Sequence, residues 1–379
     1  MLLILCCLIL GLFSGLIPGL HSNTVTSVLL SLNLTSESLP LAIVAMFGVH
    51  SIISFIPSIF LGIPDEQVVL SVLPGHRMAK EGRGIEAVMI MALSAIAALL
   101  VCIIFFPISQ ALYPVVYPLL SPYMPPILLI ASAILVFKTQ KPMHSFLIFL
   151  LAGIVGQQAF SLSLPDPFLP LFSGMFAMAA IFNFSSSPLP KQELPGKISA
   201  GLLRFSLLGV FLGWFADLLP GISSPAQVAA FASPLIPSSG AAYLALVSSI
   251  GVSESVFAFS TASTLGKARI GAIAEASAIV DVSQNLLPLL SFFIIGTAFA
   301  CIALCAFRNR IGEIAKIHVP SLNLLIAAYL ISIVFLIDSF SGLLLFAVST
   351  ALGFLCLRMN VERTLLMGAI IVPTILMLF

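Results

Sequence analysis

Long stretches without a single charged residue constrain this chain more than any other feature. Residues 87–137 contain no Asp, Glu, Lys or Arg, and the same holds for 142–165, 167–190, 218–253, 282–307, 317–337, 339–357 and 364–379. Of the 379 residues, 60% are apolar and only 8% are charged, whereas about a quarter of the residues in a soluble domain are charged. This composition excludes a cytosolic enzyme, a secreted domain and a disordered scaffold. We therefore predict a polytopic membrane protein.

The apolar stretches predict helices that cross a bilayer. A helix needs about 20 apolar residues to span roughly 30 Å of hydrocarbon, so residues 87–137 are long enough for two helices with a break in the proline-rich stretch Pro114–Pro126. The stretches lack the alternation of a membrane β-barrel. We expect an all-α fold of about 10–12 membrane segments, some too short to cross completely, with the N-terminal MLLILCCLIL as the first.

The charges that remain are nearly balanced, with 15 Lys and Arg against 14 Asp and Glu. No basic block is dense enough to neutralise nucleic-acid phosphates, which excludes a nucleic-acid partner. The expected environment is the lipid bilayer of the plasma membrane, and the positive-inside rule places most basic clusters in the cytoplasm. These clusters are Arg77/Lys80/Arg83, Lys138/Lys141, Lys191/Lys197/Arg204, Lys267/Arg269, Arg308/Arg310/Lys316 and Arg358/Arg363.

The two halves of the chain resemble each other at an offset of 202–204 residues. The matches, in order, are GLFSGLIPGLHSNTV with GVFLGWFADLLPGISSPAQV, Gly48-Val49 with Gly251-Val252, and Gly62 with Gly266; KEGRGIEA from Lys80 also resembles KARIGAIAEA from Lys267. We expect a first transmembrane repeat (1–184), a polar linker (185–200) and a second repeat (201–379). Duplicated membrane proteins are typically secondary transporters with inverted halves. Inversion conflicts with placing both Lys80 and Lys267 in the cytoplasm, and the sequence leaves this open.

A Pro-Gly pair interrupts an apolar segment in each half. Proline removes a helical N–H group and glycine adopts unusual backbone angles, so the pair breaks the helix. The polar residues that follow resemble helix N-caps, and freed N–H groups at a helix N-terminus form an anion site. Each Pro-Gly pair could instead merely kink a packed helix. The presence of a second copy at the matching position favours the anion site over this alternative. The expected lining of the anion site is Pro18, Gly19, His21, Ser22, Asn23, Thr24, Pro220, Gly221, Ser223, Ser224 and Gln227.

The segment 55–87 is too rich in glycine, proline and charge to be an ordinary span. One interpretation is a solvated loop. In the other, Pro57 and Ser58 line a substrate pathway, and Arg77 or Lys80 attracts an anion.

Two acids flanked by apolar residues are candidates for ion coupling. A charge at the bilayer centre costs about 2.5–3.5 kcal/mol, and such residues usually face a cavity. Asp217 precedes Pro220 by three residues, and Glu254 lies in the region matched to His50; we expect them to bind Na⁺ or a coupling proton.

His50 either titrates or packs as a hydrogen-bonded histidine, and Asp166 is expected in an exposed turn.

Nothing in the sequence indicates catalysis. HExxH, GxSxG and Walker motifs are absent, and no His or Cys group has metal-ligand spacing. An ATP-driven pump would need a nucleotide-binding domain, which the apolar stretches leave no room for. We expect neither an enzyme nor a bound metal or organic cofactor.

Three motifs carry a family resemblance. GLFSGLIPGL (11–20), IPDEQVVLSVLPGHRMAKEGRGIEA (63–87) and LLPGISSPAQ (218–227) resemble the large permease subunit of the tripartite tricarboxylate transporters (the TctA family), in its shorter archaeal type. The resemblance covers most of residues 10–90 and 205–280. It implies a many-helix permease that takes up carboxylates such as citrate on an ion gradient, with re-entrant Pro-Gly loops at the site. It also implies a small membrane subunit and an extracytoplasmic binding protein as partners.

Three hypotheses of function remain at this point. The first is an ion-coupled secondary transporter of small organic anions. The second keeps the architecture but moves a lipid-linked phosphate, whose headgroup the two Pro-Gly segments would hold. The third, an intramembrane enzyme or scaffold, would need a polar triad or metal site that the sequence lacks. A homo-oligomer is compatible with each of them.

Overall fold

The computed structural model describes residues 2–17, 20, 22–31, 37–62, 72–182, 189–219, 225, 228–229, 239–316 and 319–378. Over these ranges the chain is predominantly helical and contains no strand, which confirms the predicted all-α class. Six helical stretches are long and apolar enough to cross a bilayer, and four shorter apolar helices accompany them. Helices are favoured here because each one satisfies its own backbone N–H and C=O groups in the absence of water.

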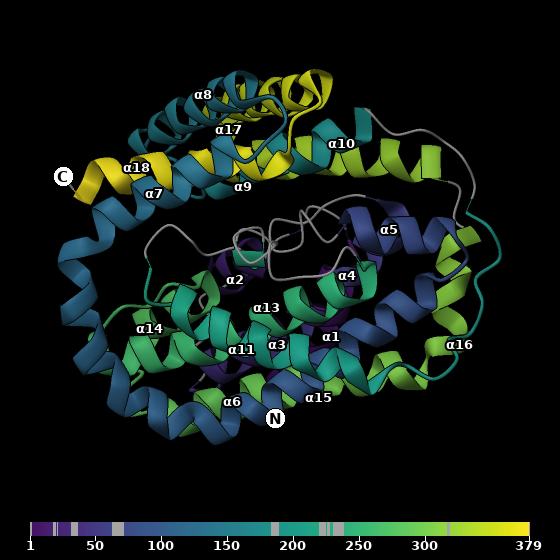
Figure 1. Ribbon diagram of the computed structural model, residues 1–379, viewed down its shortest axis with the longest axis vertical. Helices are drawn as coiled ribbons and strands as arrows, with labels where there is room; N and C mark the ends of the chain where they lie inside the picture. The colour runs from purple at the N-terminus through teal and green to yellow at the C-terminus, as the bar shows by residue number, and fades with distance from the viewer. Residues whose placement is uncertain are drawn as a thin grey trace.

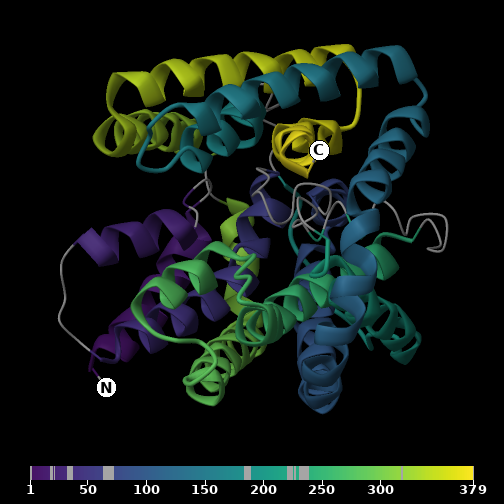
Figure 2. The same cartoon turned by 90° about the vertical axis from the view of Figure 1, so that its left-hand side faces the viewer.

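The helices form two layers (Figures 1 and 2). The lower layer in Figure 1 comprises α1 (Leu2–Leu16), α2 (Ser22–Ser31), α3 (Leu39–Ile53), α4 (Phe55–Leu61), α5 (Val72–Lys80), α6 (Gly84–Leu120), α11 (Leu203–Ala216), α13 (Gly240–Leu265), α14 (Gly271–Ile279), α15 (Leu286–Ala306) and α16 (Arg308–Ile311). The upper layer comprises α7 (Met124–Phe137), α8 (Pro142–Ser161), α9 (Phe168–Phe172), a π-helical segment (Ser173–Met178), α10 (Ala179–Phe182), α17 (Val319–Met359) and α18 (Gly368–Leu378).

The two longest apolar stretches are each divided into two helices. A 3₁₀ turn at Ser121–Tyr123 separates α6 from α7, which confirms the predicted break in the proline-rich stretch. In Figure 2, α7 leads from the lower layer to the upper one. Within α17, Ser339 has a non-helical φ of 57°, so this 41-residue element is two helices joined at that residue.

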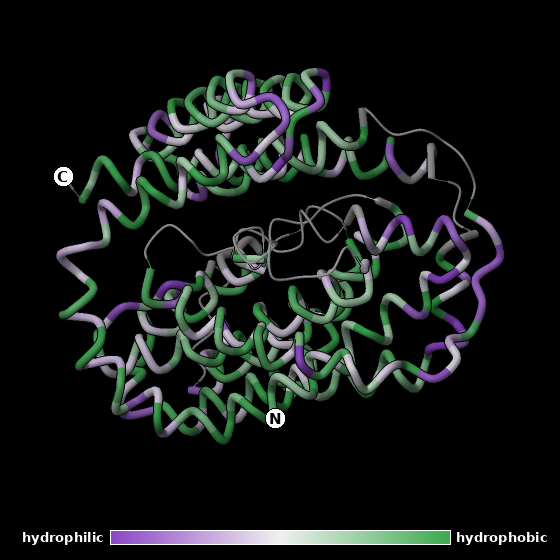
Figure 3. Tube along the Cα trace, viewed as in Figure 1, coloured by the Kyte–Doolittle hydropathy of each residue, from purple (hydrophilic) through white to green (hydrophobic). Residues whose placement is uncertain are grey.

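The core lies inside the layers, and the outside is largely apolar. One large cluster of buried side chains fills the lower layer, and two smaller clusters fill most of the upper one. Large apolar side chains remain exposed, among them Leu324, Leu336 and Phe340 on α17. In Figure 3, hydrophobic residues run along both layers while hydrophilic ones gather at loops and around α5. This distribution fits a protein whose helices face lipid.

Helices from the two halves of the chain interleave within the lower layer. Helix α1 packs on α3 as α11 packs on α13, and α3 packs on α15 as α13 packs on α6. The upper layer is similarly mixed, since α8 packs on α18 and α17 packs on α9 and α10. Each layer therefore combines segments from residues 1–184 with segments from residues 201–379.

Glycines allow the close helix pairs. A Cβ atom added at Gly15 of α1 would lie 2.8 Å from the Cβ of Ile53 on α3, and one added at Gly213 of α11 would lie 2.7 Å from the Cβ of Ser253 on α13. Small residues spaced by four let transmembrane backbones approach in this way. Gly62 after α4 and Gly266 after α13 share another role, because both end their helices in the left-handed conformation, with φ of 66° and 65°.

We expect Gly213→Leu to destabilise the protein strongly. The new side chain would overlap Ser253 and the Ile250 carbonyl, which a Cβ alone would approach to 2.8 Å, and overpacking of this kind costs about 1–3 kcal/mol or more. Thermal unfolding in detergent measures the loss. Gly196→Leu is the control, because nothing lies within 4 Å of a Cβ at Gly196; equal melting temperatures for the two variants would contradict the prediction.

Candidate functional site

Most of the Pro-Gly lining predicted from the sequence cannot be placed. Pro18, Gly19, His21, Pro220, Gly221, Ser223, Ser224 and Gln227 lie outside the described residues. Ser22, Asn23 and Thr24 open α2, as the N-cap pattern suggested. The Ser22 side chain is fully buried, and its Oγ has no hydrogen-bond partner in the described part of the chain. A buried hydroxyl left unpaired costs free energy, so the predicted role of Ser22 in binding a ligand stays a candidate.

His50 joins two helices of the lower layer. It is fully buried on α3, and its Nδ1 lies 2.9 Å from the Oγ of Ser14 on α1. Ser14 in turn donates to the Gly11 carbonyl at 3.3 Å. These contacts support the packing interpretation of His50 that the sequence left open.

The segment 55–87 divides into a buried helix and an amphipathic one. Pro57 and Ser58 lie inside α4, where every residue is buried, and the Ser58 Oγ donates to the Ser54 carbonyl at 3.1 Å. Arg77 and Lys80 are exposed on α5. A pathway role for these four residues stays a prediction, since residues 63–71 between the helices are not described.

The structure brings Asp217 and Glu254 together, although 36 residues separate them in the sequence. Asp217 follows the last turn of α11 and is 4% exposed, and Glu254 in the middle of α13 is 5% exposed. The two carboxylates are close enough to interact electrostatically. Asp217 Oδ2 and Glu254 Oε1 are buried without a hydrogen-bond partner among the described residues. Buried acids in a membrane protein usually face a cavity or a partner, so the role of this pair in ion coupling stays a prediction.

Further polar groups surround the Asp217 carboxylate. Its neighbours are Tyr113 on α6, Thr261 on α13 and Arg269 in the turn between α13 and α14. The Arg269 Nη2 donates to the carbonyl of Leu218 at 3.1 Å, next to Asp217 in the chain. The Tyr113 hydroxyl donates to the Trp214 carbonyl at 3.0 Å, and the two rings stack at 5.6 Å. Asp217 therefore lies beside the Arg269 guanidinium and the stacked pair of Tyr113 and Trp214.

Sequence reasoning missed these neighbours for identifiable reasons. Tyr113 belongs to a charge-free stretch with no polar pattern around it. Arg269 was grouped with Lys267 as a cytoplasmic loop cluster, but its Nε is buried without a partner among the described residues. The one signal in the sequence that could have indicated the role of Arg269 is its position shortly after a buried, serine-rich helix.

The expectation that Asp166 lies in an exposed turn is wrong. Asp166 is 8% exposed and Asp338 is 2% exposed. The backbone N–H of Asp166 donates to the Asp338 Oδ1 at 2.9 Å, and the N–H of Leu169 donates to the Asp166 Oδ1 at 3.2 Å. Asp338 lies 172 positions further along the chain, so the turn is buried by a contact that local sequence does not reveal.

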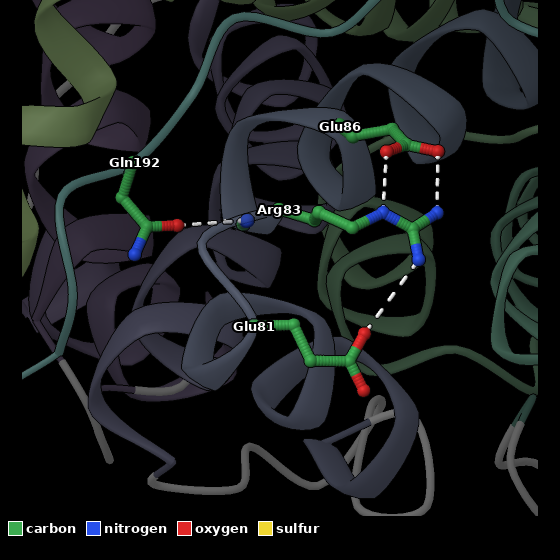
Figure 4. A network of polar contacts seen from close by, with 5 residues as sticks. Glu81, Arg83, Glu86 and Gln192 are labelled. Atoms are coloured by element: carbon green, nitrogen blue, oxygen red, sulfur yellow. Dashed lines mark hydrogen bonds and ion pairs between the residues drawn. The ribbon is translucent and has the colours of Figure 1, made fainter.

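Gln192, in the segment predicted to link the two halves, contacts the turn between α5 and α6 (Figure 4). Gln192 Oε1 accepts from the Gly84 N–H at 2.8 Å, and Gln192 Nε2 donates to the Ala79 and Pro190 carbonyls at 2.9 and 2.8 Å. In the same turn, Arg83 makes two 2.8 Å hydrogen bonds to Glu86, and these raise the pKa of the Arg83 guanidinium. The polar linker is thus fixed to the start of α6.

Gln192→Ala is expected to lower the free energy of unfolding by about 1–3 kcal/mol, because the Gly84 N–H loses its acceptor and the Ala79 carbonyl its donor. Chemical unfolding in detergent measures this difference. Glu193→Ala is the matched control, since Glu193 contacts the same turn through its backbone N–H, which donates to the Gly82 carbonyl at 2.8 Å. A loss of similar size in the control would show that Gln192 has no special role.

Buried ionisable groups within a bundle of apolar helices define a class: polytopic membrane proteins that move ions or solutes. The model of the family "Tripartite tricarboxylate transporter TctA family" matches residues 1–368. The chain therefore belongs to the TctA family and is a multi-pass protein of the plasma membrane. This is a family of transporters, which agrees with the expectation that the chain is not an enzyme, and its tripartite nature implies that the chain works with other subunits.

The chain is also similar to an uncharacterized protein, MJ1079, of Methanocaldococcus jannaschii. The two sequences are 27% identical over 391 aligned residues, which cover 97% of this chain and 96% of the other. No solved structure shows significant similarity to the chain.

Proposed function

We propose that this protein is an ion-gradient-coupled permease for small organic anions of the di- and tricarboxylate class. Family membership establishes a component of tricarboxylate transport. The observation that supports coupling is the buried pair of Asp217 and Glu254, each with a carboxylate oxygen that has no hydrogen-bond partner among the described residues. Burial of an acid at membrane depth is costly, and binding of Na⁺ or a proton offsets that cost.

The anion site of this proposal is formed by the two Pro-Gly segments. Ser22 supports it, because its hydroxyl is buried at the N-terminal end of α2 without a partner among the described residues. Freed N–H groups and the helix dipole favour an anion at such a position. The corresponding positions of the second half follow α11, the helix that ends next to Asp217. The cation and anion sites would then be neighbours, which is what coupling requires.

The proposal includes two inverted repeats, residues 1–184 and 201–379, joined by the linker 185–200. The paired packing of α1 on α3 and α11 on α13 supports it, as do the left-handed glycines at Gly62 and Gly266. A small membrane subunit and an extracytoplasmic binding protein would be the other two components. Neither the fold nor the family supports transport of a lipid-linked phosphate.

Uptake into proteoliposomes tests this function. The purified chain, with and without its partner subunits, is supplied with labelled citrate, succinate and a neutral sugar under imposed Na⁺, proton or no gradient. We expect accumulation of at least one carboxylate with one of the two ion gradients and none of the sugar. If the protein is present in the vesicles together with its partners and no carboxylate accumulates under any gradient, the proposal is wrong.

A further inference from the structure

Asp217 has charged and titratable neighbours on several elements. The charged and titratable groups that interact with this carboxylate are Tyr113 on α6, Glu254 on α13 and Arg269 in the turn after α13. Cys102 interacts with Tyr113, and Lys267 interacts with Tyr117. Residues 220–238, which follow α11, contain no titratable side chain. Lys267 is exposed and donates to the Tyr117 hydroxyl. Among the described residues, Arg269 is therefore the cation that acts on the Asp217 carboxylate.

Arg269 lies beside Asp217, and not all of its hydrogen-bond donors have a partner among the described residues. One end of its guanidinium donates to the Leu218 carbonyl at 3.1 Å, while its buried Nε–H has no partner in the described part of the chain. The carboxylate and the guanidinium attract each other, but they do not form a direct ion pair within the described residues. Among the described residues, the buried Nε–H of Arg269 and the buried Oδ2 of Asp217 thus both lack a hydrogen-bond partner.

We infer that Arg269 binds a carboxylate of the transported anion, and that Asp217 takes up a proton as the anion arrives. The inference rests on the proposed function, because it assumes an organic anion as substrate. The anion accepts hydrogen bonds from the guanidinium, which suits carboxylates through its planar fork of donors. A second negative charge beside an ionised Asp217 would be strongly unfavourable in a low-dielectric site. The proton comes from the medium and binds the Asp217 carboxylate, so it offsets the negative charge of the one carboxylate that the guanidinium binds.

The sole tryptophan of the chain, Trp214, lies three residues before Asp217 and reports on this site. Citrate is titrated into the purified chain in nanodiscs without any gradient, and Trp214 fluorescence gives Kd between neutral and alkaline pH, where citrate is ionised. Calorimetry in two buffers that differ in protonation enthalpy counts the protons taken up. For the wild type we expect Kd to rise with pH and about one proton to be bound per citrate.

Three variants separate the role of Arg269 in binding the anion from the role of Asp217 in taking up a proton. Arg269→Gln should raise Kd at least about tenfold at every pH, since a charge-assisted hydrogen bond is lost. Asp217→Asn imitates the protonated acid, so it should bind citrate at alkaline pH about three- to tenfold more tightly than the wild type and without proton uptake. Lys267→Gln is the matched control, because it removes an exposed cation two residues from Arg269, and it should bind like the wild type.

Several results would overturn the inference. The first is a Kd for citrate in Arg269→Gln equal to that of the wild type. The second is proton uptake retained in Asp217→Asn, and the third is an equal loss of citrate affinity in Lys267→Gln and Arg269→Gln. If Arg269→Gln fails to fold, Asp217→Asn still decides, because misfolding cannot produce tighter binding. Any of these results leaves the proposed function standing, whereas a wild type that binds no carboxylate and accumulates none would refute both.

Discussion

Asp217→Asn is expected to abolish gradient-driven accumulation of the substrate while leaving exchange of substrate across the membrane intact. The amide cannot take up and release a proton or hold a cation by charge, so substrate binding no longer depends on the gradient. One elementary charge moving through 100 mV contributes about 2.3 kcal/mol, which corresponds to about a 50-fold concentration ratio. The accumulation ratio should fall by up to that factor. Glu254→Gln tests the second acid in the same way.

The measurement compares uptake under an imposed gradient with counterflow at equilibrium. Asp338→Asn is the matched control, because Asp338 is equally buried but lies in the upper layer, and an amide oxygen can still accept from the Asp166 N–H. The control should accumulate substrate normally. If Asp217→Asn accumulates as well as the control, Asp217 does not couple transport to an ion.

Ser22→Ala should weaken substrate binding about tenfold with little loss of stability. The Ser22 Oγ has no hydrogen-bond partner among the described residues, so its removal costs the described fold no contact, whereas a hydrogen bond from a hydroxyl to an ionised carboxylate contributes about 1.5–3 kcal/mol. Ser224→Ala should act in the same direction, and the double variant should lose more. The Michaelis constant of uptake and the melting temperature measure the two effects.

Thr26→Val is the control for this prediction. Thr26 lies one turn after Ser22 on α2 and is equally buried, but its Oγ1 donates to the Ser22 carbonyl at 2.9 Å and is already satisfied. Uptake by this variant should have a normal Michaelis constant. Wild-type affinity in the Ser22→Ala and Ser224→Ala double variant would refute the anion site at the Pro-Gly segments.

Membrane residence and the all-α class follow from composition alone. A charge-free stretch such as residues 87–137, without the alternation of a barrel strand, is stable in lipid as a helix that satisfies its own backbone, and the proline-rich stretch indicates where this helix breaks. The family could likewise be recognised from contiguous motifs such as 63–87. These properties are local, since each depends on neighbouring residues in the chain.

The partners of the buried polar groups needed the coordinates. Asp217 and Glu254 could be singled out as costly residues, but no local pattern indicates that they meet, or that Tyr113 and Arg269 complete their surroundings. Asp166 was misjudged for the same reason, because its burial depends on Asp338 in another helix. Electrostatic and hydrogen-bonding contacts act through space between helices far apart in the chain, so only the packing of α6, α11 and α13 determines which acid faces which cation.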